Sequence, residues 1–442
     1  MRDFSRAPAG CCTSSHRQRV RSRGCDAPSN WSTHSFVVRV KAEPDLGGDV
    51  AAVLSDTIGA MRRSGIREMM DLADARADVL HLEIGEPDFP TPPHVIEAAA
   101  ASMRAGQVKY TLSRGLGPLR EAIVGKLREQ NSIAASLDQV VVTTGGTTAV
   151  LEAMLVLLRP GDGVLFPDPG WPAFEMVVTL LRGRPLRYRL RPDADYEPDL
   201  EQLERLARDA RVLVVNTPSN PTGAVLGVET TKRLLEIAER HRLVVISDEV
   251  YEDIVFDGRH TSLASLGAEV PVISVFSFSK GYAMTGWRIG YLAAPAPVAE
   301  AIVKAQEAVV ACPAFVAQHA ALAALSGPQG CIDEMREEYR ARRDLAVDIL
   351  RAEGLLLTRP RGTFYVMADI SRSGIDSYAF ARRLLVERGV AVAPGGAFGD
   401  EAADAVRLSL ASPEAVIVDG IRRIGAAIRE WEPEVPAVTR KQ

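Results

Sequence analysis

One lysine in this chain lies where burial would make its charge costly. Lys280 follows the apolar and hydroxyl run V-P-V-I-S-V-F-S-F-S (270–279), and the only other charge in S-F-S-K-G-Y-A-M-T-G-W-R-I-G (277–290) is Arg288. Burial and a nearby positive charge both lower the pKa of an amine, and such an amine attacks carbonyl carbon atoms to form a Schiff base. The alternative is a structural lysine that reaches solvent or pairs with an acid.

Three further motifs follow predicted strands, in the loops where open α/β sheets bind ligands. T-T-G-G-T-T (143–148) offers backbone N–H groups, hydroxyls and a helix N-terminus to an anion, although many strand-to-helix turns look similar. N-T-P-S-N-P-T-G (216–223) holds Asn220 between two prolines, as a fixed carboxamide or as an ordinary turn. S-D-E-V-Y (247–251) ends a strand with Asp248, which either faces a cation or caps a helix.

Other catalytic signatures are missing from the sequence. The seven histidines show no zinc-ligand spacing, and there is no P-loop, no G-x-S-x-G and no strand-anchored G-x-G-x-x-G. An amine, an acid, a phosphate-like turn and a fixed amide remain. Pyridoxal phosphate needs these four, because its aldehyde, ring nitrogen, phosphate and phenolate oxygen each require a partner.

The chain resembles the class I/II pyridoxal-phosphate-dependent aminotransferases of fold type I, the aspartate aminotransferase superfamily. The lysine stretch, N-P-T-G and S-D-E-V-Y occur in that family's order, and the resemblance spans about residues 50–435. It implies pyridoxal 5'-phosphate as the cofactor. It also implies a ping-pong transfer of an amino group between an L-amino acid and a 2-oxo acid.

The resemblance gives each motif a role. Lys280 would form the Schiff base and move the proton at the substrate Cα, and Asp248 would pair with the pyridinium nitrogen. Tyr251 would hydrogen-bond the phenolate oxygen together with Asn220, so that Lys280, Asp248 and Tyr251 are the predicted catalytic residues. The other cofactor contacts, mostly to the phosphate, would come from Gly145, Gly146, Thr147, Ser277, Ser279 and Arg288.

Residues outside these motifs are implied as well. Trp171 would stack on the cofactor ring, unless it is an ordinary core aromatic, and Tyr110 would reach the phosphate of a neighbouring subunit. A homodimer with shared active sites is therefore expected. The predicted substrate-binding residues are Arg407, which would clamp the α-carboxylate, with Gly85, Asn220 and Phe364.

The amino donor and the reaction outcome stay open. One branch of aspartate-type enzymes has a lysine directly after the Gly-Gly of the phosphate turn, where this chain has Thr147. The pocket candidates Trp171, Phe364 and Tyr365 suit aromatic or aliphatic side chains equally well. A β-lyase, an acyl condensation or a non-catalytic regulator on the same cofactor are the alternatives. The regulator is disfavoured because the N-terminal head is too short for a DNA-binding helix-turn-helix.

The elements that position these motifs predict an α/β fold. Apolar strand candidates alternate with helical patterns, which predicts a mostly parallel seven-stranded sheet flanked by helices in a large domain at 91–325. A smaller α+β domain is expected at 326–442, with an N-terminal arm and part of that domain at 49–90. The strand candidates are 79–85, 139–144, 163–169, 211–216, 243–249, 270–278 and 289–294, and later ones lie near 362–369 and 406–410. The helix candidates are 50–75, 94–105, 118–130, 147–158, 230–241, 334–354, 376–388 and 414–431.

Composition fits a cytoplasmic protein. The 442 residues carry a net charge of −5, which gives no sign of nucleic-acid binding. Residues 1–48 form a basic, serine-rich head, for which we expect a disordered extension; a transit peptide or a start codon placed too early are the alternatives. Cys312 and Cys331 are too few for a disulfide framework. The uncharged stretch 308–332 is interrupted by prolines and predicts buried helices, with no membrane contact.

Overall fold

The structure of the protein is a computed structural model that describes residues 55–267 and 269–432. The predictions for residues 1–48 therefore lie outside the described residues. For the helix predicted at 50–75, the described part forms two helices, α1 (Asp56–Ala60) and α2 (Gly65–Asp74).

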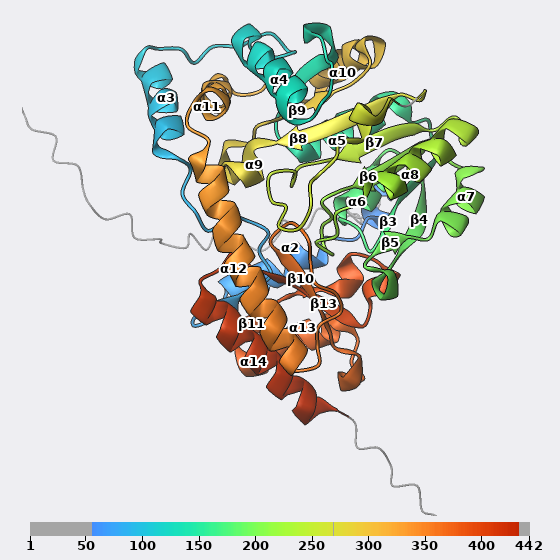
Figure 1. Ribbon diagram of the computed structural model, residues 1–442, viewed down its shortest axis with the longest axis vertical. Coiled ribbons are helices and arrows are strands. Elements are labelled where there is room, and N and C mark those ends of the chain that lie inside the picture. Colours follow the sequence, from blue (N-terminus) through green and yellow to red (C-terminus); the bar gives the residue numbers. More distant parts are fainter. Residues whose placement is uncertain (1–54, 268, 433–442) are drawn as a thin grey trace, which may run out of the picture. The chain divides into compact units, whose positions relative to one another are not determined.

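A mixed eight-stranded sheet forms the centre of the fold, in the order β2-β9-β8-β7-β6-β3-β4-β5 (Figure 1). Neighbouring strands from β8 to β4 run parallel, whereas β9 is antiparallel to both β2 and β8. The strands are β2 (Val140–Thr143), β3 (Gly163–Asp168), β4 (Arg184–Arg191), β5 (Glu197–Pro198), β6 (Val212–Asn216), β7 (Val244–Asp248), β8 (Val272–Ser277) and β9 (Gly290–Ala293). The predicted α/β class and the mostly parallel sheet are confirmed, with the two-residue β5 added to seven longer strands.

Several strand assignments differ from the sequence prediction, and two of the differences are informative. Strand β4, R-P-L-R-Y-R-L-R, was missed because its charged residues interrupt the continuous apolar run expected of a covered strand. The strand predicted at 79–85 shortens to β1 (Leu80–His81), which pairs with β11 (Val390–Ala391) outside the large sheet.

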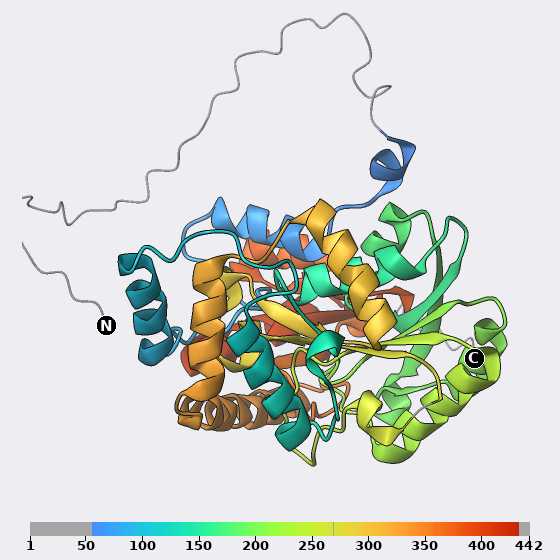
Figure 2. The ribbon, with the colours of Figure 1, turned by 90° about the horizontal axis from the view of Figure 1, so that it is seen from above.

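Helices cover both faces of the sheet, as Figure 2 shows along its edge. Alternate residues of β6 point to opposite sides: Val212 and Val214 pack in the cluster with α5, α6 and α10, whereas Leu213 and Val215 pack with α7 and α8. Both faces are therefore apolar, as a parallel sheet covered on two sides requires. These helices are α5 (Gly146–Leu157), α6 (Ala173–Leu180), α7 (Leu200–Ala207), α8 (Val228–His241) and α10 (Ala296–Val309).

Most of the uncharged stretch 308–332 is helical and packs against other helices. It holds α11 (Phe315–Ser326), which packs on α3 (Pro93–Arg104) and α4 (Gly117–Gln130). Among the helices of the described residues, none is long and apolar enough to cross a membrane.

A second group of elements follows α12 (Gly330–Ala352) and appears below the large sheet in Figure 1. Strands β10 (Tyr365–Asp369), β13 (Ala405–Ser409) and β12 (Ala393–Pro394) form an antiparallel sheet. They share an apolar cluster with α12, α13 (Ser377–Arg388) and α14 (Glu414–Trp431).

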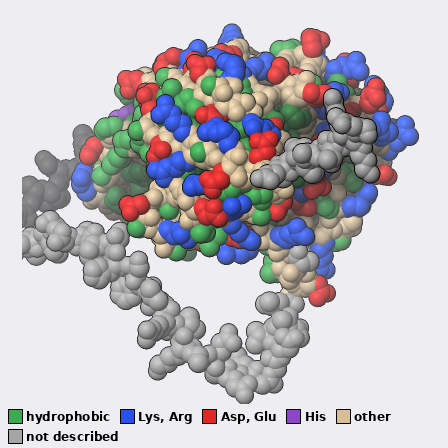
Figure 3. All heavy atoms as spheres, turned by 90° about the horizontal axis from the view of Figure 1, so that it is seen from below, with side chains coloured by type: hydrophobic (Ala, Val, Ile, Leu, Met, Phe, Trp, Pro, Cys, Tyr) green, Lys and Arg blue, Asp and Glu red, His purple; other side chains and the backbone are tan. Residues whose placement is uncertain are grey.

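Positive and negative side chains are interspersed on the face seen in Figure 3. The domain boundaries after residues 90 and 325 stay predictions.

Parallel strands place polar residues at one edge of the large sheet. Strands β3, β6, β7 and β8 end at Asp168, Asn216, Asp248 and Ser277. Because their carboxyl ends meet at the same edge, the loops that follow them form the place where a ligand can be bound.

Candidate active site

The first part of the site is the turn that begins α5. Gly145 is the N-cap and has φ +94°, and a Cβ there would lie 2.9 Å from the guanidinium of Arg288. A Cβ on Gly146 would lie 3.8 Å from Cβ of Ser277, whose hydroxyl accepts a hydrogen bond from the Ser279 backbone at 3.1 Å. The helix N-terminus, the hydroxyl and the arginine thus meet in one place, which is suited to an anion.

Lys280 lies on the short helix α9 (Phe278–Gly281), directly after β8. Its Nζ donates to the backbone oxygen of Gly85 at 2.5 Å and lies 5.6 Å from the ring centroids of Tyr251 and Phe364. Burial, with a contribution from Arg407, lowers the pKa of Lys280 to about 8. About one tenth of this amine is therefore neutral and nucleophilic at pH 7, far more than at the ordinary lysine pKa of 10.5.

Asp248 ends β7 and is almost fully buried. Burial raises its pKa to about 7, while the backbone N–H of Val250, 3.4 Å from Oδ1, and the nearby Lys280 act in the opposite direction. The next residue, Glu249, pairs with His260: Oε2 of Glu249 lies 2.7 Å from Nε2 of His260, and both side chains are buried. Among the described residues, Asp248 is the carboxylate of this pair that lacks such a partner, and it is available to a ligand.

Arg407 of β13 is buried and bonded to neutral groups. Its Nη1 donates to Oδ1 of Asn220 at 3.1 Å and its Nη2 to the backbone oxygen of Glu83 at 2.5 Å, while Nε has no partner among the described residues. The guanidinium lies 4.1 Å from the ring centroid of Tyr365 and 5.0 Å from that of Phe398. A buried guanidinium with an unused N–H is an anchor for a carboxylate.

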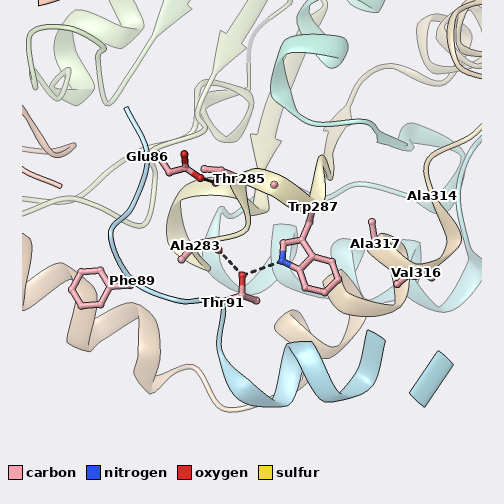
Figure 4. Close-up of a pocket in the computed structure, with 10 residues that line it drawn as sticks. Glu86, Phe89, Thr91, Ala283, Thr285, Trp287, Ala314, Val316 and Ala317 are labelled. Carbon is pink, nitrogen blue, oxygen red and sulfur yellow. Dashed lines mark hydrogen bonds between the residues drawn. The ribbon is translucent and has the colours of Figure 1, made fainter. Parts of the chain in front are cut away.

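A pocket of about 570 Å³ opens beside this site (Figure 4). The segment after Lys280 forms one wall with Ala283 and Trp287, and α11 contributes Val316. The Thr91 hydroxyl donates to the backbone oxygen of Ala283 at 2.7 Å and accepts from the indole N–H of Trp287 at 3.0 Å. Glu86 is the charged residue of the lining, which is otherwise apolar or neutral.

Comparison with known proteins places this arrangement in a family. Residues 77–424 match the family "Aminotransferase class I and II". The chain is 37% identical to an aspartate aminotransferase of Pyrococcus abyssi, over 85% of this chain and 98% of the relative. It is 35% identical to aromatic-amino-acid aminotransferase 2 of Thermococcus litoralis, over 85% and 98%. The chain belongs to the class I and II aminotransferases. A solved Thermus thermophilus aspartate aminotransferase double mutant has a TM-score of 0.80 at 36% identity and covers 85% of this chain and 99% of its own.

The aminotransferase structure brings most of the predicted site residues into two adjoining groups. One group surrounds the amine and contains Lys280, Tyr251, Gly85, Phe364, Asn220 and Arg407, with Asp248 close enough to affect the pKa of Lys280. The other group forms the anion turn and contains Gly145, Gly146, Ser277, Ser279 and Arg288, with Thr147 exposed on the first turn of α5.

Two predicted residues make no hydrogen bond and no aromatic contact with these groups in the described part of the chain. The partly buried ring of Trp171 packs edge-on against Phe174, with the ring centroids 5.4 Å apart, and its stacking role in the aminotransferase stays a prediction. Tyr110 is 90% exposed, and its role likewise stays a prediction.

Sequence reasoning missed two residues of the aminotransferase site. Phe398 flanks the Arg407 guanidinium, and the G-G-A-F-G pattern around it marks a tight loop that could have been noticed. Asn216 accepts from the backbone N–H of Asn220 at 2.9 Å and donates to the backbone oxygen of Asp248 at 3.2 Å. It thereby ties two of the motifs together. Asn216 is the first residue of the motif N-T-P-S-N-P-T-G, but its role depends on strand pairing that the sequence does not reveal.

Proposed function

We propose that this aminotransferase binds pyridoxal 5'-phosphate on Lys280 and works as a homodimer. The observation that carries the proposal is the partly buried amine of Lys280, with a pKa lowered to about 8, beside a buried carboxylate and an anion turn. Members of this family use pyridoxal phosphate. The substrates would be an L-amino acid and a 2-oxo acid.

The residues present fit this cofactor. Gly145 has no room for a Cβ beside Arg288, so the backbone and the guanidinium approach as closely as a phosphate site requires. Asp248 forms no ion pair with the residues that the structure describes and would hold the pyridine nitrogen, and the Tyr251 hydroxyl would donate to the phenolic oxygen. When bound, the cofactor supplies an electron sink for the bond that is broken at the substrate Cα.

The chain's own groups would then bind the substrate and move its proton. The buried Arg407 guanidinium, with its unused Nε, would take the α-carboxylate, and Asn220 would fix its orientation. Once free, the Lys280 amine is the base that takes a proton from the substrate Cα and returns it during transamination. Its lowered pKa supports this role, because a base with a pKa near neutral is both available and reactive.

The exposed segment around Tyr110 supports the homodimer. Val108, Tyr110 and Leu112 are 60%, 90% and 73% exposed, an unusual row of large side chains on one extended stretch. Buried Gln318 fixes the end of this stretch, since its amide donates to the Thr111 hydroxyl at 3.0 Å and accepts from the backbone N–H of Leu116 at 2.7 Å. A second copy of the chain would cover these side chains. Sedimentation at micromolar concentration should give a dimer, and a persistent monomer would contradict it.

Absorbance spectroscopy tests the reaction. The purified protein should carry a visible band that bleaches when one amino acid is added and returns when a 2-oxo acid follows. The donor panel should contain aspartate, glutamate, phenylalanine and alanine, because the relatives named above are an aspartate and an aromatic-amino-acid enzyme. A band that stays unchanged with every donor would point to a regulator. Release of pyruvate and ammonia from a β-substituted donor would point to a β-lyase, and either outcome contradicts the proposal.

A further inference from the structure

The hydroxyl of Tyr365 lies at the centre of the site but has no role in the reaction described above. It is 2.8 Å from the hydroxyl of Tyr251, and both side chains are buried. It also packs against Gly85, where a Cβ would lie 2.3 Å from it, and Gly85 is the residue whose carbonyl accepts from Lys280. The hydroxyl is therefore enclosed by residues that hold the amine and the predicted cofactor.

The ring of the same residue supports the predicted substrate clamp. Tyr365 begins β10, and in the antiparallel register Met367 lies opposite Arg407 of β13, so Tyr365 is the diagonal neighbour of Arg407 on the same face. The guanidinium lies 4.1 Å from the Tyr365 ring centroid, within the range of a cation–π contact. A side chain that flanks a buried guanidinium restricts where its free N–H can point.

The two contacts join different parts of the fold. Tyr251 follows β7 of the large sheet, whereas Tyr365 and Arg407 belong to the three-stranded sheet of β10, β13 and β12. A shift between the two sheets would change the Tyr251–Tyr365 hydrogen bond and the position of the guanidinium together.

We propose that Tyr365 is a positioning residue with two separable actions: its hydroxyl orients and polarises the Tyr251 phenol, and its ring holds the Arg407 guanidinium in place for the α-carboxylate. The inference rests on the proposed function. If Tyr251 donates to the phenolic oxygen of the cofactor, its own oxygen is free to accept from Tyr365. Hydrogen bonds in such a chain strengthen one another, so Tyr365 makes Tyr251 the better donor.

The variant Tyr365→Phe tests the hydroxyl, because it keeps the ring. A weaker donor at the phenolic oxygen favours the proton on the Lys280 nitrogen, so the pH midpoint of the visible band of the pyridoxal-phosphate-loaded protein should rise by about 0.3–1 unit. The KM for the amino donor should stay within about twofold. An unchanged midpoint would overturn the first action, whereas a protein that takes up no pyridoxal phosphate would instead overturn the proposed function.

A double-mutant cycle shows whether the hydroxyl acts through Tyr251. In the Tyr251→Phe background, Tyr365→Phe should no longer shift the midpoint, because the connecting hydroxyl is gone. An equal shift in both backgrounds would mean a general change of the site and would contradict the proposal.

The variant Tyr365→Leu tests the ring. Loss of the cation–π contact should raise the KM for the amino donor roughly 3- to 30-fold beyond that of Tyr365→Phe. The thermal unfolding of both variants is measured first, so that a fold defect in the leucine variant is recognised; the phenylalanine variant then still decides the first action. If the folded leucine variant has the same KM as the phenylalanine variant, the second action is wrong.

Discussion

Two buried regions of this aminotransferase contain ionisable groups without an opposite charge bound to them. At the edge of the large sheet, Asp248, Lys280 and Arg407 are hydrogen-bonded only to neutral groups in the part of the chain that the structure describes. In the middle of α5, Glu152 is fully buried, and neither of its carboxyl oxygens has a partner among the described residues. Burial raises the pKa of Asp248 to about 7 and that of Glu152 to about 8.

The difference lies in what surrounds the two carboxyl groups. Asp248 lies near two cations, Lys280 and Arg407, and near the turn that is suited to an anion. A cofactor with a phosphate and a pyridine nitrogen, together with a substrate that carries a carboxylate, would compensate all of these buried charges. Glu152 has no ionisable neighbour of this kind in the described part of the chain, and its helix packs against α6, α10 and the sheet. A raised carboxyl pKa alone therefore does not mark a functional group; at Asp248 the second indication is its place beside the Lys280 amine in the candidate site.

The largest effect is expected at the sheet edge, from Lys280→Ala. Removal of the nucleophile and base should lower kcat by roughly 10³–10⁴-fold or more. Single-turnover absorbance with the best donor of the panel measures it. Lys280→Arg is the matched control, because it keeps the charge but not the nucleophile, and it should be equally inactive. Turnover within tenfold of the parent in either variant would remove Lys280 from its role.

Asp248→Asn should have the next largest effect. The amide keeps the shape but loses the negative charge, so kcat should fall about 10²–10³-fold and the affinity for pyridoxal phosphate should drop. Glu249→Gln is the neighbouring control: this carboxylate is equally buried but is bound to His260, so kcat should change far less. Similar losses in kcat for the two variants would mean that burial alone, and not the position facing the ligand, makes Asp248 important.

The sequence predicts a site residue well when its motif lies in one short segment, and poorly when its role depends on partners that are distant in the chain. Lys280, Asp248 and Asn220 stand in contiguous motifs that follow apolar strands, so a short segment predicts both the chemistry and the place. Arg407 was found only by resemblance, because its partners Asn220 and Glu83 lie far away in the chain.

Other features depend on pairing that no single segment encodes. The Tyr251–Tyr365 bond requires the register of β10 with β13 and the packing of two sheets. Strand β4 was missed since its alternating charges belong to a strand near the sheet edge. Glu152 looks like an ordinary helix residue in the sequence, and only the packing of α5 reveals that it is buried with no hydrogen-bond partner among residues 55–267 and 269–432.

Arg407→Lys should have a smaller effect, concentrated on substrate binding. Lysine keeps the charge but loses the planar fork, so the KM for the amino donor should rise roughly 10- to 100-fold with a smaller change in kcat. Arg343→Lys is a matched control. Arg343 is equally buried, but it forms an ion pair with Asp257 (2.7 Å), which is not one of the candidate site residues. That control should lose stability and keep its KM. An unchanged KM in Arg407→Lys would mean that another residue, and not Arg407, binds the α-carboxylate.

The smallest effect on turnover is expected from Glu152→Gln, and this variant separates the two regions most directly. The Glu152 carboxyl has a pKa of about 8 in the folded chain and an ordinary value of 4.5. The folded state therefore binds more protons than the unfolded state between these values, and stability falls as pH rises from about 5 to 8. One proton gives a slope of at most about 1.4 kcal/mol per pH unit.

Glutamine does not titrate. The free energy of unfolding of the variant, measured in urea, should therefore fall less steeply with pH, by up to this slope, with turnover unchanged. The Asp248 contribution is common to both proteins and cancels in their difference. Parallel stability curves would show that Glu152 is solvated or paired in solution, and the contrast between an orphan carboxyl and a functional one would then fail.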